Sequence, residues 1–396
     1  MSLETPAAAP VEPGPRPAPA SRGSGRARTV GWWLVAGTAL VYAPMAFEYM
    51  FRFVGDGPRL WQRAYEAVVG ETQAAGVGSV HTEQAGTYAD LRWLLLGHTA
   101  VGALALAIAV FQITARSRAT PGLHRTLGRV QVGMVVVSMS GALAYLAAAG
   151  PSDTFDGPPF FAQLVVLAGG TLAATLLGWL AMRRRWLASH RTLMLLAFAL
   201  LCTAPALRVE YLVLGLAWPD VTQEVVNLAG GAVLGVLAPI AAMVGAGPVR
   251  VPRASASAPA VPEALLRVAV PLLVTGLAAV AVGHLLVGLD VDRVTLTTLV
   301  ALAVGLTVVA VQARAARQGG DPRLAAEWDV HLVAACAVPA VVAVLWLAYA
   351  PLMTTHEALG AALLTGPALP LATAVVLVAW TRRPVRAAVE VSAAGR

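Results

Sequence analysis

Five ionisable side chains lie inside long apolar runs of the sequence, where a charge is costly. They come from four different runs and are Glu48, His98, Arg208, Glu210 and His284. An ionisable group at membrane depth must pair, face water or face the interior of a helical bundle, so each is a candidate for function. Arg208 is the strongest candidate, because a guanidinium cannot shed its charge and needs a carboxylate, a ligand or water.

The positions of these five residues along their runs place them at one level, roughly 5–10 Å below the outer surface of the membrane for a helix that rises about 1.5 Å per residue. One interpretation is an outward-facing polar pocket that binds a small charged or polar ligand or passes protons. The other is that each group is accommodated singly. Arg208 and Glu48 then reach toward the headgroups, Glu210 pairs with Arg208, and the histidines are interior groups.

A second set of candidates surrounds a repeated tetrapeptide, His-Arg-Thr-Leu, which begins at His124 and again at His190. Each copy follows a basic turn and opens a new apolar run, which indicates a duplicated helical hairpin. The inner-face motif defined by these turns consists of Gln112, His124, Arg125, Arg129, His190 and Arg191. The first interpretation is that its arginines contact anionic lipid headgroups.

Two histidines at equal depth on facing helices are also the pattern of axial haem ligands in a membrane cytochrome. The ligand pair is either His124 with His190 or His98 with His284, and the sequence does not rank the two pairs. The Cys-x-x-Cys-His attachment motif is absent from the sequence. We therefore predict no cofactor and keep b-type haem as the alternative.

The elements that position these residues are membrane-spanning helices. The chain has 396 residues, of which 58% are hydrophobic and 12% charged, whereas soluble proteins carry about 25% charged residues. A spanning helix needs about 20 mostly apolar residues. About ten such runs lie near 31–54, 91–114, 130–150, 160–182, 192–214, 225–246, 268–289, 294–313, 331–350 and 358–380. We predict an all-α integral membrane protein, a polytopic bundle of nine or ten helices with a duplicated hairpin in its first half.

The charges of the loops predict the orientation of this bundle. Arginines gather in loops 115–129 and 183–191, whereas loops 151–159 and 217–224 contain no basic residue. Cytoplasmic loops carry the basic excess, so we place the two arginine-rich loops and both termini in the cytoplasm. The net charge of +7 is then a topology signal, and we expect the lipid bilayer as a partner and no nucleic acid.

The same features divide the chain into seven segments. These are a disordered cytoplasmic tail (1–28), a first transmembrane helix (29–54), an extracytoplasmic loop (55–90), a membrane domain (91–246), a cytoplasmic linker (247–262), a second membrane half (263–382) and a cytoplasmic tail (383–396). Within the outer loop, apolar residues from Leu60 to Val69 share one helical face. That pattern predicts a helix that lies in the membrane interface or packs on the bundle.

Residues 91–230 resemble an uncharacterised bacterial membrane family, domain of unknown function 2306 (DUF2306). The resemblance rests on a His-containing helix that ends in Phe-Gln, a His-Arg-x-x-Gly-Arg turn and a second His-Arg-x-x-Met start. The matching positions are His98, Phe111, Gln112, His124, Arg125, Gly128, Arg129, His190, Arg191, Met194, Leu207, Arg208 and Asn227. The resemblance implies a bacterial inner-membrane protein and an architecture, but no reaction, and it does not extend to the second half.

The sequence contains no nucleotide-binding loop, hydrolase elbow or zinc-protease motif. We therefore predict no catalytic residue and a non-enzymatic membrane protein with a polar pocket, transporter-like or sensor-like. The alternatives are an electron-transfer protein that binds b-type haem and a structural or assembly role in the cell envelope. Neither the ligand nor the oligomeric state follows from the sequence.

The arginine asymmetry of the loops makes the orientation testable. A reporter fused after Arg118 or Arg185 is expected to lie in the cytoplasm, and one fused near Asp156 outside, as an alkaline phosphatase and green fluorescent protein pair would register. The reverse pattern at either arginine-rich loop would contradict the orientation and every depth assigned from it.

Overall fold

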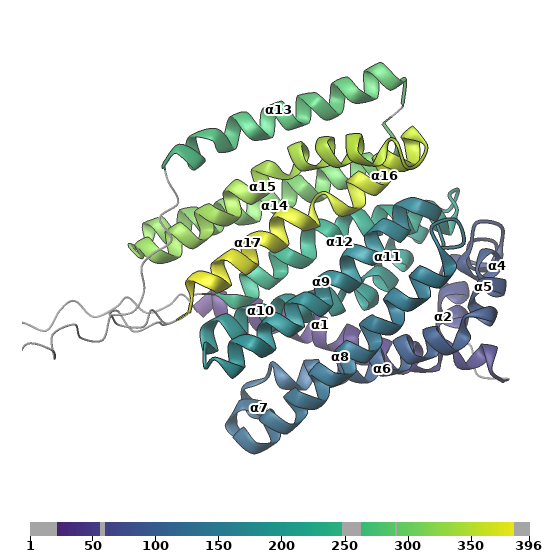
Figure 1. The fold of residues 1–396 in the computed structure, drawn as a ribbon, viewed down its shortest axis with the longest axis horizontal. Helices are drawn as coiled ribbons and strands as arrows, with labels where there is room; N and C mark the ends of the chain where they lie inside the picture. Colours follow the sequence, from purple (N-terminus) through teal and green to yellow (C-terminus); the bar gives the residue numbers. More distant parts are fainter. Residues whose placement is uncertain (1–21, 56–59, 248–262, 290, 384–396) are drawn as a thin grey trace, which may run out of the picture.

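The protein is a bundle of membrane-spanning helices. The computed structural model describes residues 22–55, 60–247, 263–289 and 291–383, and across these ranges it holds helices and no strand. Ten segments in the described ranges are long and apolar enough to cross a membrane. This result confirms the predicted all-α polytopic fold, whose helices run along one common direction (Figure 1).

The spanning segments are α1 (Arg22–Glu48), α6 (Arg92–Gln112), α8 (Pro121–Ala149), α9 (Gly157–Arg183), α10 (Leu187–Leu201) with α11 (Thr203–Ala217), α12 (Gln223–Ala246), α13 (Glu263–Val287), α14 (Arg293–Gln318), α15 (Pro322–Tyr349), and α16 (Thr355–Thr365) with α17 (Ala368–Thr381). The short elements are η1 (Phe51–Phe53), α2 (Leu60–Val69), α3 (Glu71–Ala75), α4 (Val80–Glu83), α5 (Ala85–Asp90) and α7 (Ala115–Ala119). Helices α2 to α5 gather at one end of the bundle, the loop end, on the right in Figure 1. The opposite end, the basic end, carries α7, the α9–α10 turn and the end of α17.

Several helices extend beyond the apolar runs that predicted them. Helix α8 begins at Pro121 and α15 at Pro322, both upstream of the predicted starts at 130 and 331. In α15 the Asp321 side chain accepts hydrogen bonds from the backbone N–H groups of Arg323 and Leu324, at 3.1 and 3.0 Å. Such a cap satisfies free helix-end donors, so the helix continues past the residues that hydropathy counts as membrane.

The predicted tails and linker lie almost wholly outside the described residues. Of the tail 1–28, residues 22–28 form the start of α1. Of the linker 247–262 and the tail 383–396, only their first residues are described.

Two of the ten spans are interrupted near prolines. Helices α10 and α11 meet at Cys202, three residues before Pro205, and α16 and α17 meet at Gly366 and Pro367. Proline lacks the N–H that would bond four residues back, so the helix changes direction there. At the first break the Thr203 hydroxyl donates to the Leu200 carbonyl at 2.7 Å and satisfies a carbonyl next to the interruption.

Helix α2 forms as predicted and packs on the bundle. Its Tyr65 is buried, stacks on Trp61 at 5.5 Å between ring centroids and lies 5.9 Å from the ring of Tyr211 on α11. The Glu48 carboxylate at the end of α1 accepts a 3.0 Å hydrogen bond from the Leu60 N–H at the start of α2. Helix α2 is therefore fixed over the loop end by aromatic packing and an end cap.

A buried ion pair closes the basic end. The Arg382 guanidinium donates to both carboxylate oxygens of Glu327, at 3.1 and 2.6 Å. It also donates to the Thr192 hydroxyl at 2.9 Å and to the Gly247 carbonyl at 3.0 Å. Arg382 and Glu327 are 5% and 4% exposed, so these bonds join α10, α12, α15 and the end of α17 away from water.

We expect Arg382→Met to destabilise the bundle by about 3–5 kcal/mol, because it leaves the Glu327 carboxylate buried with a weaker partner. The matched control is Arg383→Met, which removes an exposed guanidinium stacked on Trp380 and is expected to cost less than about 1 kcal/mol. Unfolding of the purified variants in detergent measures both values. Equal losses at the two positions would contradict the importance of the buried pair.

Candidate functional site

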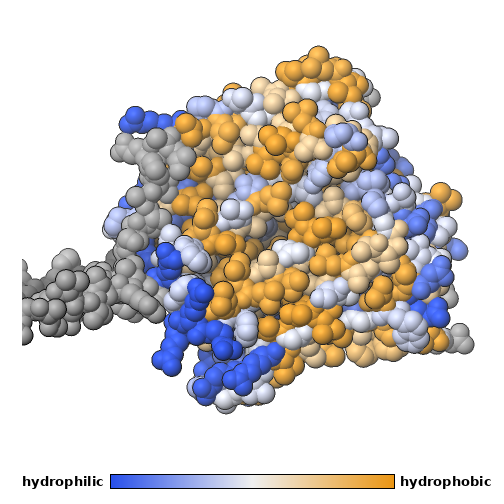
Figure 2. All heavy atoms as spheres, in the orientation of Figure 1, coloured by the Kyte–Doolittle hydropathy of each residue, from blue (hydrophilic) through white to orange (hydrophobic). Residues whose placement is uncertain are grey.

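A cavity of about 740 Å³ lies in the first half of the bundle. Its walls come from α1, α6, α8, α9, α10, α11 and α12, from the loop helices α2, α4 and α5, and from α16 and α17 of the second half. Figure 2 shows apolar side chains over most of the lengthwise surface and hydrophilic ones toward its two ends. The cavity thus lies at the level of the apolar belt, and its size is within the range of about 300–1,000 Å³ common for ligand sites.

Arg208 is the one arginine that lines the cavity, and no Asp or Glu is among the described lining residues. Its guanidinium carbon lies 5.7 Å from the ring centroid of Trp61 and 5.1 Å from that of Tyr211. Within the described part of the chain it forms no ion pair with a carboxylate. The predicted pairing of Arg208 with Glu210 is therefore absent, since side chains two apart on a helix point in different directions.

Aromatic residues collect around this guanidinium. The sequence has seven tyrosines. Five of them line the cavity, namely Tyr42, Tyr49, Tyr88, Tyr145 and Tyr211. A sixth, Tyr65, stacks on the lining residue Trp61. Ring faces attract a cation, by about 2 kcal/mol or more where water is excluded, so the faces of Trp61 and Tyr211 stabilise the charge of Arg208 and leave its N–H donors available.

The sequence analysis missed this tyrosine cluster, because its members come from α1, α2, α5, α8 and α11. Burial raises the pKa of Tyr65 to about 12, and burial also raises that of Tyr88. Both residues lie in the loop between spans, and at neutral pH their phenols are hydrogen-bond donors, not anions. The sequence does contain one indication of this cluster. Tyrosines are few, and most of them lie near the predicted outer ends of spans.

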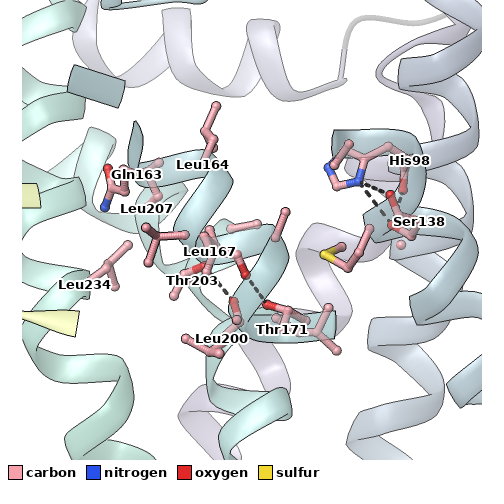
Figure 3. Close-up of a pocket in the computed structure, with 18 of the residues that line it drawn as sticks. His98, Ser138, Gln163, Leu164, Leu167, Thr171, Leu200, Thr203, Leu207 and Leu234 are labelled. Carbon is pink, nitrogen blue, oxygen red and sulfur yellow. Dashed lines mark hydrogen bonds between the residues drawn. The ribbon is translucent and has the colours of Figure 1, made fainter. Parts of the chain in front are cut away.

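His98 lies on the α6 wall of the cavity (Figure 3). Its Nδ1 is 3.0 Å from the carbonyl oxygen of Ser138 on α8, and the Ser138 hydroxyl donates to the His98 carbonyl at 2.8 Å. A carbonyl oxygen only accepts, so Nδ1 carries the proton and Nε2 is left as an acceptor. Figure 3 shows that second ring nitrogen turned toward the open space.

The other three predicted pocket residues lie elsewhere. Glu48 caps α2, and Glu210 lies against Gly230 of α12. His284 is on α13, at the edge of the bundle in Figure 1, with its ring 5.8 Å from that of Trp346. Depth along a helix does not fix direction around it, so of the five residues the structure brings only His98 and Arg208 to the cavity.

A chain of buried polar groups leads from the cavity toward the loop end. The Tyr211 hydroxyl donates to the side-chain oxygen of Asn227, and the Asn227 amide donates to a carboxylate oxygen of Asp156. Asn227 is fully buried, and the second Asp156 oxygen has no partner in the described residues. Burial raises the pKa of Asp156 well above its usual range, although the bond from Asn227 acts in the opposite direction.

The inner-face motif forms the turns of the two hairpins at the basic end. In the first hairpin the Gln112 amide donates to the His124 carbonyl at 2.9 Å. In the second the His190 Nδ1 lies 2.9 Å from the Gly178 carbonyl oxygen. Each contact joins a residue on one helix to the histidine twelve positions later. The remaining motif residues Arg125, Arg129 and Arg191 are exposed.

In each hairpin a glycine on one helix faces a long side chain on the other, but the two hairpins place the glycine on opposite helices. In the first, Gly128 faces the long side chain of Gln112, whose amide nitrogen is 3.7 Å from an added Cβ. In the second, the long side chain is Met194 and the glycine is Gly178, where an added Cβ would lie 2.8 Å from the Met194 sulfur. Repeated helix pairs pack closely where a small residue meets a large one, so these motif positions are packing partners.

The histidine positions bear on the haem alternative. The second candidate pair does not share a site, because His98 lines the cavity while His284 packs on Trp346 of α15. For the first pair, a backbone carbonyl holds His190 and the Ser117 hydroxyl, at 2.9 Å, holds His124. Neither of these two residues lines the cavity. The pair His124 and His190 stays a prediction for haem, and the cavity lined by Arg208 and His98 does not extend to it.

Residues 95–242 match the family model described as "Predicted membrane protein (DUF2306)". The predicted resemblance is confirmed over this segment. It runs from α6 to α12 and so includes both hairpins, His98, Arg208 and Asn227. The chain has no match among curated proteins or among solved structures. The DUF2306 segment supplies most of the cavity wall, whereas α1, the loop helices and α17 lie outside it.

The raised pKa of Asp156 predicts the pH dependence of stability. The folded state holds the Asp156 proton more tightly than the unfolded chain does, so the contribution of Asp156 to the free energy of unfolding is fully present at low pH. It declines as pH rises from the unfolded pKa through the folded one. Asp156→Asn keeps an oxygen that can accept from Asn227 and removes the titration. We expect the variant to match the wild type at roughly pH 4 and to be more stable at roughly pH 8.

Thermal unfolding of both proteins across this pH range measures the effect. The nearby Glu224 also repels the Asp156 charge, so Glu224→Gln is a useful control that should reduce the decline without abolishing it. An unchanged pH profile in Asp156→Asn would contradict the assignment.

Proposed function

We propose that this protein is a membrane-embedded binding protein, transporter-like or sensor-like, that accommodates a ligand in the cavity lined by Arg208 and His98. By the predicted orientation, the loop end faces outward from the bacterial inner membrane, so Arg208 and the tyrosine cluster lie in the outer part of the bilayer.

The observation that supports this proposal is the unpaired guanidinium of Arg208 in a cavity of ligand size. Arg382, by contrast, is a structural arginine. Its guanidinium donates to both carboxylate oxygens of Glu327 and to two further acceptors. Within the described part of the chain, Arg208 meets the faces of two aromatic rings and forms no ion pair. A charged donor set kept free of internal acceptors at membrane depth indicates that its hydrogen-bond partner comes from outside the chain.

The cavity offers two kinds of polar group to a ligand. Arg208 supplies donors at the aromatic side, and the Nε2 of His98 supplies an acceptor on the α6 wall. The fixed tautomer of His98 matters here, because the bond from its Nδ1 to the Ser138 carbonyl holds the ring in one orientation before the ligand arrives.

A cavity-filling variant tests the proposal. Gly169 lines the cavity, and a Cβ added there meets nothing within 4 Å, so Gly169→Leu is expected to place its side chain in the cavity without moving the backbone. Gly133 on α8 is equally free of neighbours, is exposed and does not line the cavity. Gly133→Leu is therefore a matched control with the same change in helix propensity.

The measurement is mass spectrometry of small molecules retained by protein purified in mild detergent. We expect wild type and Gly133→Leu to retain a molecule that Gly169→Leu loses by about tenfold or more, a loss of about 1.4 kcal/mol or more in binding. Equal retention by all three proteins would place the ligand elsewhere.

The two alternatives give different results on the same preparations. A haem protein from cells supplied with haem precursor has a Soret absorption band, which His124→Gln or His190→Gln would abolish; we expect no such band. A purely structural role predicts that Gly169→Leu changes neither retained molecules nor any phenotype of the cells at unchanged protein abundance.

A further inference from the structure

We propose that the ligand of this cavity is an amphipathic anion, a carboxylate or phosphate monoester on one apolar chain, with its head at Arg208 and its chain in the inner part of the cavity. This inference rests on the proposed function and names the class of ligand. It follows from how polar groups are distributed along the cavity wall.

The head site contains donors and no carboxylate. Tyr42 and Tyr88 line the same cavity as Arg208, and neither hydroxyl makes a hydrogen bond within the described part of the chain. Both residues lie close enough to Arg208 to interact with its charge. A planar guanidinium suits a carboxylate or phosphate, and phenol donors in the same cavity can supply further hydrogen bonds to such a group.

The inner part of the cavity is mostly apolar, and two of its threonines have their hydroxyls bonded within their own helices. The Thr171 hydroxyl donates to the Leu167 carbonyl at 2.7 Å, and the Thr203 hydroxyl donates to the Leu200 carbonyl at 2.7 Å. Figure 3 shows both bonds directed along the helices, away from the open space. The hydroxyl donors of both threonines are therefore already used, and this region offers a ligand mainly methyl and methylene surface.

Other ligand classes fit this wall less well. A cation is disfavoured by Arg208, and a neutral apolar molecule would leave the guanidinium without a partner at membrane depth. A sugar or peptide needs many acceptors and donors along its length, and the lining residues supply few of them beyond Arg208, His98 and the tyrosines. His98 faces the cavity from α6 with an acceptor nitrogen and so fits a water or a hydroxyl of the ligand.

The probes are hexadecanoate, hexadecyl phosphate, hexadecanol and acetate, each titrated onto the purified full chain in nanodiscs of neutral lipid. We expect both long-chain anions to bind at least about tenfold more tightly than hexadecanol or acetate, because head and chain each contribute. The two anions together show whether the head site prefers carboxylate or phosphate.

Arg208→Gln is expected to weaken hexadecanoate binding by about tenfold or more and to leave hexadecanol binding unchanged. The control is Arg293→Gln. Arg293 also lies over a tryptophan, 5.3 Å from the Trp218 ring, but pairs with Asp220 and does not line the cavity. If Arg208→Gln does not fold, the double variant Tyr42→Phe with Tyr88→Phe removes the two hydroxyls only and should weaken the anions selectively.

The inference is overturned if hexadecanol binds as tightly as hexadecanoate, or if the head-site variants weaken both probes equally. If Gly169→Leu still blocks hexadecanol in that case, the cavity remains the binding site and only the ligand class is wrong. If Gly169→Leu affects no probe, the proposed function fails as well.

Discussion

The charge of an arginine side chain cannot be removed by burial, and this bundle buries that charge in two different ways. At the basic end Arg382 is matched atom by atom, with both Glu327 oxygens, the Thr192 hydroxyl and the Gly247 carbonyl. Deeper in the first half, Arg208 is met by the faces of Trp61 and Tyr211. The first arrangement ties helices together, and the second leaves donors directed into a cavity.

This contrast organises the molecule along its long axis. The ion pair of Arg382 joins the last helix of the second half to α10 and α12 of the first, so the basic end is closed by polar contacts as well as by packing. At the other end the aromatic cluster, held down by α2 and α5, surrounds a space that side chains leave open. The closely packed basic end therefore holds a paired arginine, and the hollow region holds an arginine that meets aromatic rings.

The second half contributes support to the cavity through α12. This helix packs on α14 and α17, and Gly305 of α14 lies so close that an added Cβ would be 2.6 Å from Ile240. Held from that side, α12 presents Asn227 to Tyr211 and Asp156, and its Gly231 lies beside Gln163, whose amide donates to the Gly231 carbonyl at 2.7 Å. The DUF2306 segment thus forms most of the site, and the remainder of the chain fixes its far wall.

The sequence by itself determined the class of fold, the number of spans and the family resemblance, because hydrophobic length and repeated motifs are local properties of the chain. It also identified Arg208, His98 and Asn227 as residues of interest. The tertiary structure decided which of the depth-matched groups meet: Glu48, Glu210 and His284 turn away from the cavity, since rotation about a helix axis is set by packing. It also decided the partners of Arg382 and the gathering of the tyrosines, because both join residues that are distant along the chain.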